Sequence, residues 1–578
     1  MPLLEGEALR NVYRDILNGR RRLIGWGAVG AFPYHCMQAP VLPEYLVDGD
    51  PAKAGQKVCD ISIFPPERLM AEDPDGCCVA VYPEDRDWVR EIADQLEQLG
   101  PFIAIPPFRL EIDGQMVHEE LERCRTAGGP KLARIDDGQI GAMLRNWPAA
   151  QLGSSIATLQ STANRDLPPV VRGRARLLTG NLQPGGAERQ IVYLASGLRR
   201  AGWDVELLTL GAPSPGCDHY VEDLARAGVP NRILPPARMA FSQGNTPGLL
   251  PNDIKRITGV LGQLPLEIIH QTAMAYRIFA SERPELVVCY LDTSNVAGGV
   301  AALMAGIPHI LVSGRNINPS HFPNHYSNAL RWLQKYYKVL AGFPDLRLSA
   351  NSSAGARSYE DWLELPAGTV HTVPNGVPAT AVALADLSEV ARVRAELSLP
   401  TDAPLIAGIF RLAVEKQPRL FVETLRRVAA LRPDMHAVVV GTGPLRPMME
   451  AAVAAAGLQD RVHLMGARPD ARSFLAASDL LLHTALAEGH PNAVLEAQLL
   501  NRPVVCTDGG GTRECLVPWL REHVHATDDA DGLARSCLEV LSDLPAAHGR
   551  MATARNWVLD NFSLERLVAN TLAAAGIR

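Results

Sequence analysis

Short apolar runs alternate along this chain with longer segments in which apolar residues recur every three or four positions. A first series lies between residues 21 and 108, where a helix is predicted at 87–99 and strands at 23–25, 45–47, 78–81 and 102–105. A second, more regular series begins at residue 174 with a strand, a Gly-rich loop, a helix and another strand. Because alternating strands and helices are typical of parallel sheets, both series predict α/β domains.

Breaks in this alternation divide the chain. Gly, Pro and Ser residues gather between positions 128 and 169, which indicates a linker, although residues 152–163 within it have the composition of a helix. A second break follows Asn375-Gly376, after which a new strand is predicted at 405–408. We therefore predict a small domain at 1–125, a partly helical linker at 126–170, and larger domains at 171–375 and 376–578. The last helix is expected to pack back on the first of these two larger domains.

Composition narrows the class of protein. At 578 residues the chain is long enough for three or four domains with cores of their own. With 47% hydrophobic and 21% charged residues it has the composition of a soluble globular protein, and a net charge of -7 argues against a nucleic-acid partner. The ten cysteines form no Cys-x-x-Cys pair, and charged residues interrupt the N-terminal segment where a signal peptide would be apolar. We therefore expect a cytoplasmic protein.

Two carboxylates, Glu488 and Glu496, lie eight positions apart on either side of a predicted helix start. Pro491 suits the first helical position, so Glu488 precedes the helix and Glu496 lies about one and a half turns inside it. Free N–H groups at a helix N-terminus favour phosphate, and carboxylates beside them accept hydrogen bonds from sugar hydroxyls. The combination predicts a site for a nucleotide sugar.

The same segment resembles the Glu-x7-Glu signature of retaining glycosyltransferases with the GT-B fold, specifically glycosyltransferase family 4. Further matches follow in the order that the family has, from near Arg176 to the end of the chain. They are a Gly-Gly-Ala-Glu loop at 185–188, an interdomain segment at 373–377, an Arg-x4-Lys pair at 411 and 416, and the segments 441–444 and 462–466. The resemblance implies two doubly wound parallel-sheet domains that face a cleft, and we expect a small Rossmann-like α/β domain in front of them.

The resemblance also implies roles for individual residues. Arg411 and Lys416 would bind the donor pyrophosphate and stabilise the leaving nucleoside diphosphate. Glu496 would bind the ribose hydroxyls, and Glu488 would contact the transferred sugar. The other donor-binding candidates are Gly185, Gly186, Thr442, Gly466, Arg468, Gly489, His490, Pro491 and Asn492. The alternatives without a ligand are surface cations, an ordinary tight turn at the glycines, and carboxylates that cap a helix.

The acceptor side departs from the family pattern. Many members carry a His-x-His element on the strand that here covers residues 286–290, and Val288 and Tyr290 replace those histidines. Asp292 is the nearest ionisable group, and it either orients an acceptor hydroxyl as a catalytic residue or caps the helix that follows. Arg315 ends the next strand at the same edge of the sheet, where ligands of α/β proteins bind, and is a candidate for the donor phosphate or an anionic acceptor.

Retention in this family is attributed to a same-face displacement in which a donor phosphate oxygen takes the acceptor proton. Catalysis then depends on positioning and on charge stabilisation. GT-B enzymes generally need no metal or other cofactor, and we expect none at the Asp-x-Asp triplets that begin at residues 48, 73, 85 and 529. The expected reaction moves a hexose from a nucleoside-diphosphate sugar to a glycan or lipid-linked acceptor, in polysaccharide or glycolipid biosynthesis.

The N-terminal segment supplies a competing hypothesis. Gly25, Gly27 and Gly30 form a Gly-x-Gly-x-x-Gly pattern after a predicted strand, and Asp48 closes the second strand. In a dinucleotide-binding unit such glycines approach a pyrophosphate and the acid binds a ribose. Pro33 lies in the first turns of the expected helix, which favours a structural or interaction module. The alternatives to a transferase are therefore an NAD-dependent oxidoreductase acting on sugars and a degenerate transferase that serves as a scaffold.

Residues 321–340 combine aromatic and basic residues at helical spacing. Such a helix can rest on an anionic membrane, as a lipid-linked acceptor would require. It can equally pack its aromatic residues inward and expose the basic ones to solvent, which is the common arrangement in globular proteins. Peripheral contact with the inner face of a membrane therefore enters as an alternative to a wholly cytoplasmic location.

Overall fold

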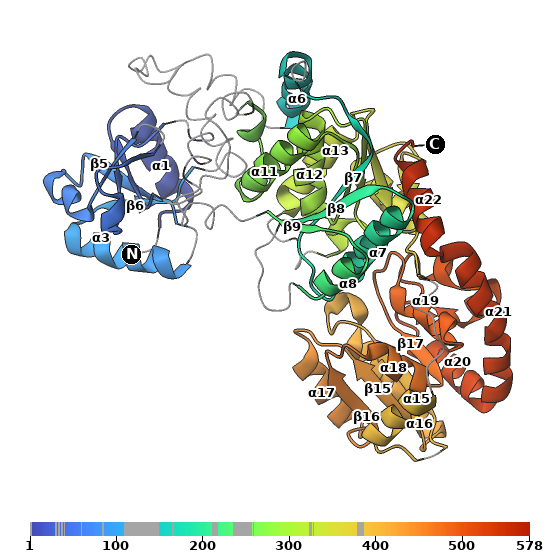
Figure 1. Ribbon diagram of the computed structural model, residues 1–578. Coiled ribbons are helices and arrows are strands. Elements are labelled where there is room, and N and C mark those ends of the chain that lie inside the picture. Colours follow the sequence, from blue (N-terminus) through green and yellow to red (C-terminus); the bar gives the residue numbers. More distant parts are fainter. Residues whose placement is uncertain are drawn as a thin grey trace.

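Three sheets follow one another along the chain (Figure 1). The structure is a computed structural model and describes residues 3–28, 32, 35, 39, 41–58, 61–83, 86–108, 149–163, 167–210, 218–234, 257, 259–322, 326, 329–378, 387–400 and 402–577. Within these residues every strand pairing is parallel except β3 with β4, at the edge of the first sheet. The α/β class that the sequence predicts is confirmed.

The N-terminal sheet has the strand order β3-β4-β2-β1-β5-β6. Its strands are β1 (Arg22–Trp26), β2 (Leu46–Val47), β3 (Lys57–Val58), β4 (Ile61–Phe64), β5 (Cys77–Val81) and β6 (Ile103–Ile105). Neighbouring residues of β1 point to opposite faces, so Leu23 packs with helix α1 (Gly6–Leu17) and Ile24 with α3 (Arg86–Leu99). Helices on both faces explain the continuous apolar strands, and they make this a Rossmann-like α/β domain.

The middle sheet has seven strands in the order β13-β12-β11-β10-β7-β8-β9. They are β7 (Val171–Thr179), β8 (Asp204–Thr209), β9 (Asn231–Ile233), β10 (Pro284–Tyr290), β11 (His309–Ser313), β12 (Leu346–Ala350) and β13 (Val370–Thr372). The helices of this part are α6 (Ala149–Ala163), α7 (Gly186–Arg200), α8 (Val221–Arg226), α11 (Leu266–Glu282), α12 (Asp292–Met304), α13 (Leu330–Leu340) and α14 (Ser353–Leu363). The order changes direction between β7 and β10, and ligands of doubly wound sheets bind beside such a point.

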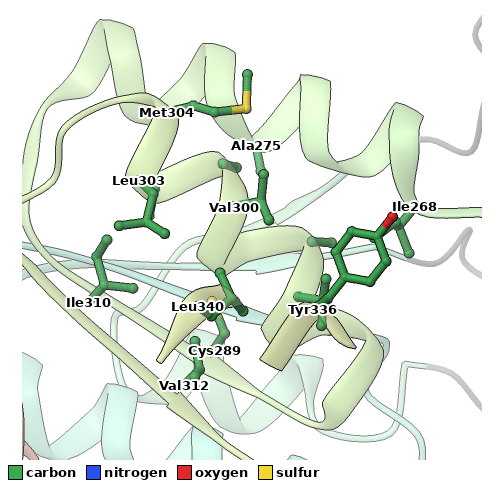
Figure 2. Close-up of a cluster of buried hydrophobic side chains, with 14 of the residues drawn as sticks. Ile268, Ala275, Cys289, Val300, Leu303, Met304, Ile310, Val312, Tyr336 and Leu340 are labelled. Carbon is green, nitrogen blue, oxygen red and sulfur yellow. The ribbon is translucent and has the colours of Figure 1, made fainter. Parts of the chain in front are cut away.

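Helix α12 lies at the centre of the largest core. Its side chains are buried along nearly the whole helix, because α6 and α11 cover its outer side and the middle sheet covers its inner side. In Figure 2, Val300 and Leu303 lie between Ala275 of α11 and the strand residues Cys289 and Ile310. A helix held on all sides fixes the position of its first residues, which lie at the carboxyl edge of the sheet.

The C-terminal sheet has the order β16-β15-β14-β17-β18-β19. Its strands are β14 (Leu405–Ile409), β15 (His436–Val440), β16 (Val462–Gly466), β17 (Leu480–His483), β18 (Val504–Thr507) and β19 (Val524–His525). Its helices are α15 (Leu387–Glu396), α16 (Pro418–Leu431), α17 (Arg446–Ala455), α18 (Ala471–Ala477), α19 (Asn492–Leu499), α20 (Ala530–Ser542) and α21 (Leu544–Phe562).

The last helix, α22 (Leu564–Ala574), returns to the middle sheet and packs against α7 (Figure 1). Gly197 of α7 makes the contact close, since a Cβ there would lie 2.6 Å from Val568 and 3.1 Å from Leu564. The side-chain hydroxyl of Ser563 accepts the Arg566 N–H and caps the helix. Together with the segment around Asn375, this helix gives a second connection between the middle and C-terminal sheets.

Candidate functional site

The loops that leave the carboxyl ends of the middle and C-terminal sheets contact each other. Glu514, in the 3₁₀ turn η7 (Thr512–Cys515), accepts the backbone N–H groups of Ser353 and Ala354 at 2.7 and 2.8 Å. Asn375, between the two sheets, donates to the carbonyl oxygen of His490 at 2.6 Å. Since ligands of α/β folds bind at the carboxyl ends of the strands, the site is expected at this interface.

A buried ion pair forms the C-terminal side of the interface. Lys416, the last residue of the turn η6 (Val414–Lys416), donates to Glu488 Oε1, and His483 Nε2 lies 3.4 Å from the same oxygen. Burial alone raises the pKa of Glu488, but the charge of Lys416 and the contact with His483 outweigh it and lower the pKa to about 2. Glu488 is therefore ionised at neutral pH, and its charge compensates that of Lys416.

Arg411 lies on the loop before that turn and is more exposed than Lys416. Its guanidinium donates to Glu415 at 2.6 Å, and 55% of the side chain is accessible, against 18% for Lys416. Two cations thus follow β14 within one short loop, one held by a buried carboxylate and one at the surface. An exposed arginine keeps the freedom to turn toward a phosphate.

The loop after β15 passes very close to the Arg411 loop. A Cβ on Gly441 would lie 1.9 Å from the carbonyl oxygen of Phe410, and one on Gly443 would lie 2.4 Å from that of Leu412. The carbonyl oxygen of Thr442 accepts the N–H of Leu412 at 3.0 Å, and that of Gly466, at the end of β16, accepts the N–H of Gly441 at 2.8 Å. The backbone of this loop therefore supports the cations.

Arg468, two residues beyond β16, has protein partners for its guanidinium. It donates to Asp470 and Glu396 at 2.8 and 2.9 Å, and it lies 4.9 Å from the centre of the Phe474 ring. The hydrogen bond with Asp470 raises the pKa of this guanidinium, and burial opposes that rise. Thr442, Gly466 and Arg468 all lie at the carboxyl edge of the sheet, and their contact with a nucleotide stays a prediction.

The two glycines predicted to approach a phosphate begin helix α7. Gly185 is the N-cap residue, and a Cβ there would lie 2.0 Å from Oε2 of Glu188, whose side chain returns over the helix start. Burial raises the pKa of Glu188, while a hydrogen bond from Gln183 and the charge of Arg411 oppose that rise. Glycine at position 185 leaves room for this side chain, and binding of a phosphate by Gly185 and Gly186 stays a prediction.

Helix α19 begins opposite α7, one residue later than the sequence pattern suggests. Pro491 occupies the N-cap position and Asn492 is the first helical residue. The Asn492 side chain donates to the carbonyl oxygen of Gly186 at 3.3 Å and accepts from Gln190 and Asn375 at 3.0 and 2.9 Å. Asn492 therefore joins three separate segments at the interface.

The residues just before α19 are tightly enclosed. A Cβ on Gly489 would lie 2.0 Å from Oδ1 of Asn351, at the end of β12. His490 is buried against the Phe562 ring, at 4.7 Å between ring centres, and neither ring nitrogen has a hydrogen-bond partner among the described residues. Burial, assisted by the charge of Arg315, lowers the pKa of His490 to about 3, so the imidazole is neutral at physiological pH.

Glu496 faces α7 across the interface. Its Oε1 lies 2.7 Å from Nη1 of Arg189, and both side chains are largely buried. The charge of Arg472, on α18, also acts in this cluster. The structure therefore places Glu496 in an ion pair with Arg189 of the other domain. The sequence did not predict this pair.

Arg315 is buried beneath the segment that joins the two sheets. Its guanidinium lies 4.4 Å from the centre of the Tyr290 ring and donates to the Val373 carbonyl oxygen at 3.1 Å and to the Asn375 side chain. Burial lowers its pKa, and it forms no ion pair with a carboxylate of the described residues. Arg315 thus anchors the interdomain segment, and its contact with a phosphate or an anionic acceptor stays a prediction.

Asp292 is the first residue of α12, and Leu291, with φ of 75°, holds the N-cap position instead. The Asp292 carboxylate accepts hydrogen bonds from Tyr326 and Tyr337 at 2.7 and 2.8 Å, and from Tyr359. Burial raises its pKa, while the three hydroxyls oppose that rise. The capping alternative is therefore wrong, because the side chain serves the tyrosines; a direct catalytic role stays a prediction.

In the N-terminal domain, Asp48, Gly25 and Gly27 of the predicted nucleotide site contact other residues of the protein. The Asp48 carboxylate accepts the Ala28 N–H at 2.7 Å and pairs with Lys53 at 3.0 Å. A Cβ on Gly25 would lie 2.3 Å from Leu46, and Gly27 has a φ of 94° beside Pro83. Gly30 lies outside the described residues. Nucleotide binding here stays a prediction, while Gly25 and Gly27 have structural reasons of their own to be glycine.

The aromatic residues of α13 face inward. Trp332, Tyr336 and Tyr337 are buried in the core around α12, whereas Lys335 and Lys338 are exposed. This matches the solvated-helix alternative, and peripheral membrane contact stays a hypothesis. Among the helices that the structure describes, none is both long and apolar enough to cross a membrane.

Comparisons with known proteins agree with this geometry. Residues 184–380 match the model of Glycosyltransferase Family 4, and residues 403–543 match that of Glycosyl transferases group 1. This chain belongs to glycosyltransferase family 4. It is thus a glycosyltransferase, and the two matches cover the regions that carry the Gly-Gly-Ala-Glu and Glu-x7-Glu motifs.

Relatives and solved structures resemble the same part of the chain. The Vi polysaccharide biosynthesis protein VipC/TviE of Salmonella typhi is 25% identical over 424 residues, 70% of this chain and 72% of that protein. The 2-deoxystreptamine glucosyltransferase of Streptomyces kanamyceticus is 25% identical over 393 residues, 66% of this chain and 97% of that protein. The structure of Anabaena HepE in complex with UDP and glucose has a TM-score of 0.56 at 20% identity, and the match covers 69% of this chain and 99% of that one. The GT-B fold is confirmed.

Proposed function

We propose that this family 4 transferase moves a hexose from a nucleoside-diphosphate sugar to a glycan or lipid-linked acceptor, with retention of the anomeric configuration. One observation carries the proposal. Arg411, the Lys416–Glu488 pair and the N-termini of α7 and α19 come together at the interface between the two sheets. Cations and free N–H groups at helix starts are the groups that bind a pyrophosphate.

The donor would lie with its diphosphate between Arg411, Lys416 and the start of α19. As the bond from the sugar to the diphosphate breaks, negative charge grows on the leaving phosphate oxygen, and the two cations stabilise it there. Glu488 is ionised and fixed by Lys416, so it can accept a hydroxyl of the transferred sugar. In a same-face displacement the leaving phosphate oxygen also takes the acceptor proton, and these residues then contribute positioning and charge.

The proposal for the class of acceptor is based on the relatives of this chain. The match to the Salmonella protein named for Vi polysaccharide biosynthesis extends over more of this chain than the match to the Streptomyces glucosyltransferase. HepE was solved with UDP and glucose, which supports a hexose and a nucleoside diphosphate as the donor. We therefore place the reaction in polysaccharide or glycolipid assembly.

Thermal melting of the full chain with UDP, GDP, ADP or NAD tests the proposal. A nucleoside diphosphate at about a hundred times its dissociation constant should stabilise the protein by about 2.7 kcal/mol. Lys416→Ala and Glu496→Ala should abolish that shift, because they remove the phosphate cation and the ribose carboxylate. Lys338→Ala and Glu364→Gln, which change an exposed ion pair outside the site, serve as matched controls and should keep it.

The result also distinguishes the competing functions. Stabilisation by one nucleoside diphosphate supports the transferase and identifies the base of the donor. A response to NAD alone that survives Lys416→Ala would move the chemistry to the N-terminal domain and overturn the proposal. With a donor identified, the anomeric configuration of the product, read by nuclear magnetic resonance, decides between retention and inversion.

A further inference from the structure

Two helices from different domains, α7 and α19, contact each other through side chains near their N-termini. Asn492, the first residue of α19, contacts the carbonyl oxygen of Gly186 and the side chain of Gln190, at 3.3 and 3.0 Å. One turn further along α19, Glu496 forms its ion pair with Arg189 of α7 at 2.7 Å. Residues four apart share one face of a helix, so Asn492 and Glu496 both face α7.

The ion pair in this interface is specific. Glu496 is the only carboxylate among the described residues that pairs with Arg189, and 29% and 21% of the two side chains are accessible. The contact with Arg189 uses Oε1 of the Glu496 carboxylate. The side chains of Tyr193 and Tyr220 lie near the Arg189 guanidinium.

We propose that Arg189 is a positioning residue, which orients the Glu496 carboxylate so that its second oxygen accepts a ribose hydroxyl of the donor. The inference rests on the proposed function, because it deepens the role of Glu496 in that site. A carboxylate on a free surface samples several rotamers, and an arginine bonded to one oxygen removes most of that freedom. Because Arg189 belongs to the other domain, the ribose site is complete only when the domains are together.

The competing explanation is that Arg189 merely holds the two domains closed. Glu514 provides the matched control, since its carboxylate also joins the two domains but, within the described part of the chain, accepts hydrogen bonds from the N–H groups of Ser353 and Ala354 alone. A residue that acts by closure alone would weaken every nucleotide equally when it is removed. A residue that orients Glu496 would change the preference for ribose over deoxyribose.

The experiment measures binding of UDP and 2′-deoxy-UDP to the full chain by calorimetry, or of the GDP or ADP pair if that base is the one that stabilises the protein. We expect the wild type to prefer the ribonucleotide by about tenfold, as a hydrogen bond to a charged group provides. Arg189→Met should bind the ribonucleotide about tenfold more weakly and lose the preference. Arg189→Lys should restore part of it, and Glu514→Ala should keep the full ratio.

The outcomes separate this inference from the function on which it rests. An unchanged ratio in Arg189→Met, or an equal loss of the ratio in Glu514→Ala, overturns the positioning role. A wild type that binds both nucleotides equally overturns the inference but leaves the transferase standing. A wild type that binds no nucleoside diphosphate refutes the proposed function itself. If Arg189→Met does not fold, judged by its melting curve, the Arg189→Lys ratio decides.

Discussion

At the scale of single residues, the site depends on charges that the fold keeps buried and paired. Lys416 and Glu488 lie on different loops of the C-terminal sheet, and in their buried position each compensates the charge of the other. An isolated buried charge costs several kcal/mol, so the pair is stable only as a pair. The same residues are the ones expected to contact the diphosphate and the sugar, and stability and function are therefore coupled at this position.

Lys416→Met should consequently destabilise the protein. The substitution leaves Glu488 buried without its cation, which should lower the free energy of unfolding by about 3 kcal/mol at neutral pH. Urea unfolding followed by tryptophan fluorescence measures the loss. Lys338→Met, at an exposed ion pair, is the control and should change little.

The effect also has a direction with pH. The pKa of Glu488 is lowered from 4.5 to about 2, so the stabilisation by Lys416 is complete above pH 4.5 and is lost as the pH falls toward 2. The difference between wild type and Lys416→Met should be largest near neutral pH and narrow on acidification, because burial without the cation raises the pKa of Glu488 in the variant, which then takes up a proton before the wild type does. A difference that grew on acidification would contradict the ionised, paired state of Glu488.

At the scale of elements, helix N-termini are the recurring device. Helix α19 begins at the interface without a side-chain cap, whereas the Glu188 carboxylate returns over the start of α7 and the Glu514 carboxylate from the other domain occupies the start of α14. A carboxylate there satisfies two N–H groups and matches the helix dipole. The fold thus places a carboxylate at the starts of α7 and α14 and leaves the start of α19, near the cations, without one.

Glu514→Ala should loosen the first turn of α14. The substitution removes the carboxylate that accepts the N–H groups of Ser353 and Ala354. Loss of such a cap lowers the free energy of unfolding by about 1 kcal/mol. Hydrogen exchange at these two amides should become faster. Glu514→Gln, which keeps one acceptor oxygen, should give an intermediate rate, and equal protection in all three proteins would argue against the contact.

At the scale of the whole molecule, two domains meet through closely fitted backbone. Gly489 approaches Asn351 and the Cα of Asn316, where a Cβ would lie at 2.0 and 2.9 Å. A Cβ on Gly511 would likewise lie 2.5 Å from the Ser352 hydroxyl. Helix α22 and the segment around Asn375 connect the same two sheets by other routes. The site is therefore assembled by domain contact, and its quality depends on how closely the domains approach.

Gly489→Ala tests this dependence. The added methyl group overlaps a backbone atom, which cannot move aside as a flexible side chain would, so the domains should separate slightly. Nucleoside-diphosphate affinity should fall by about tenfold or more, because a small misplacement of binding groups is costly. Small-angle scattering should show a larger radius of gyration. Gly549→Ala, at a helical position with no atom within 4 Å, is the matched control and should affect neither quantity.

Local patterns were enough for much of this description. Apolar spacing and the residues that begin helices predict the strands around Gly25, the β-α-β unit near residue 174, and a helix start within one residue of the observed one at Asn492. The order of the motifs indicated the family, and the matches of family models to residues 184–380 and 403–543 confirm it. Domain boundaries at residues 125, 170 and 375 stay predictions, because sequence breaks mark linkers without fixing where a core ends.

The sequence by itself determined which elements form and which chemical groups the two domains carry, because strand and helix periodicity and the Glu-x7-Glu spacing are local properties. Only the tertiary structure decided which of these groups meet. Gln190 and Asn492 are 302 positions apart, Arg189 pairs with Glu496, and three tyrosines converge on Asp292. Such contacts depend on how helices and domains pack, and no local pattern of residues encodes a partner that lies far away along the chain.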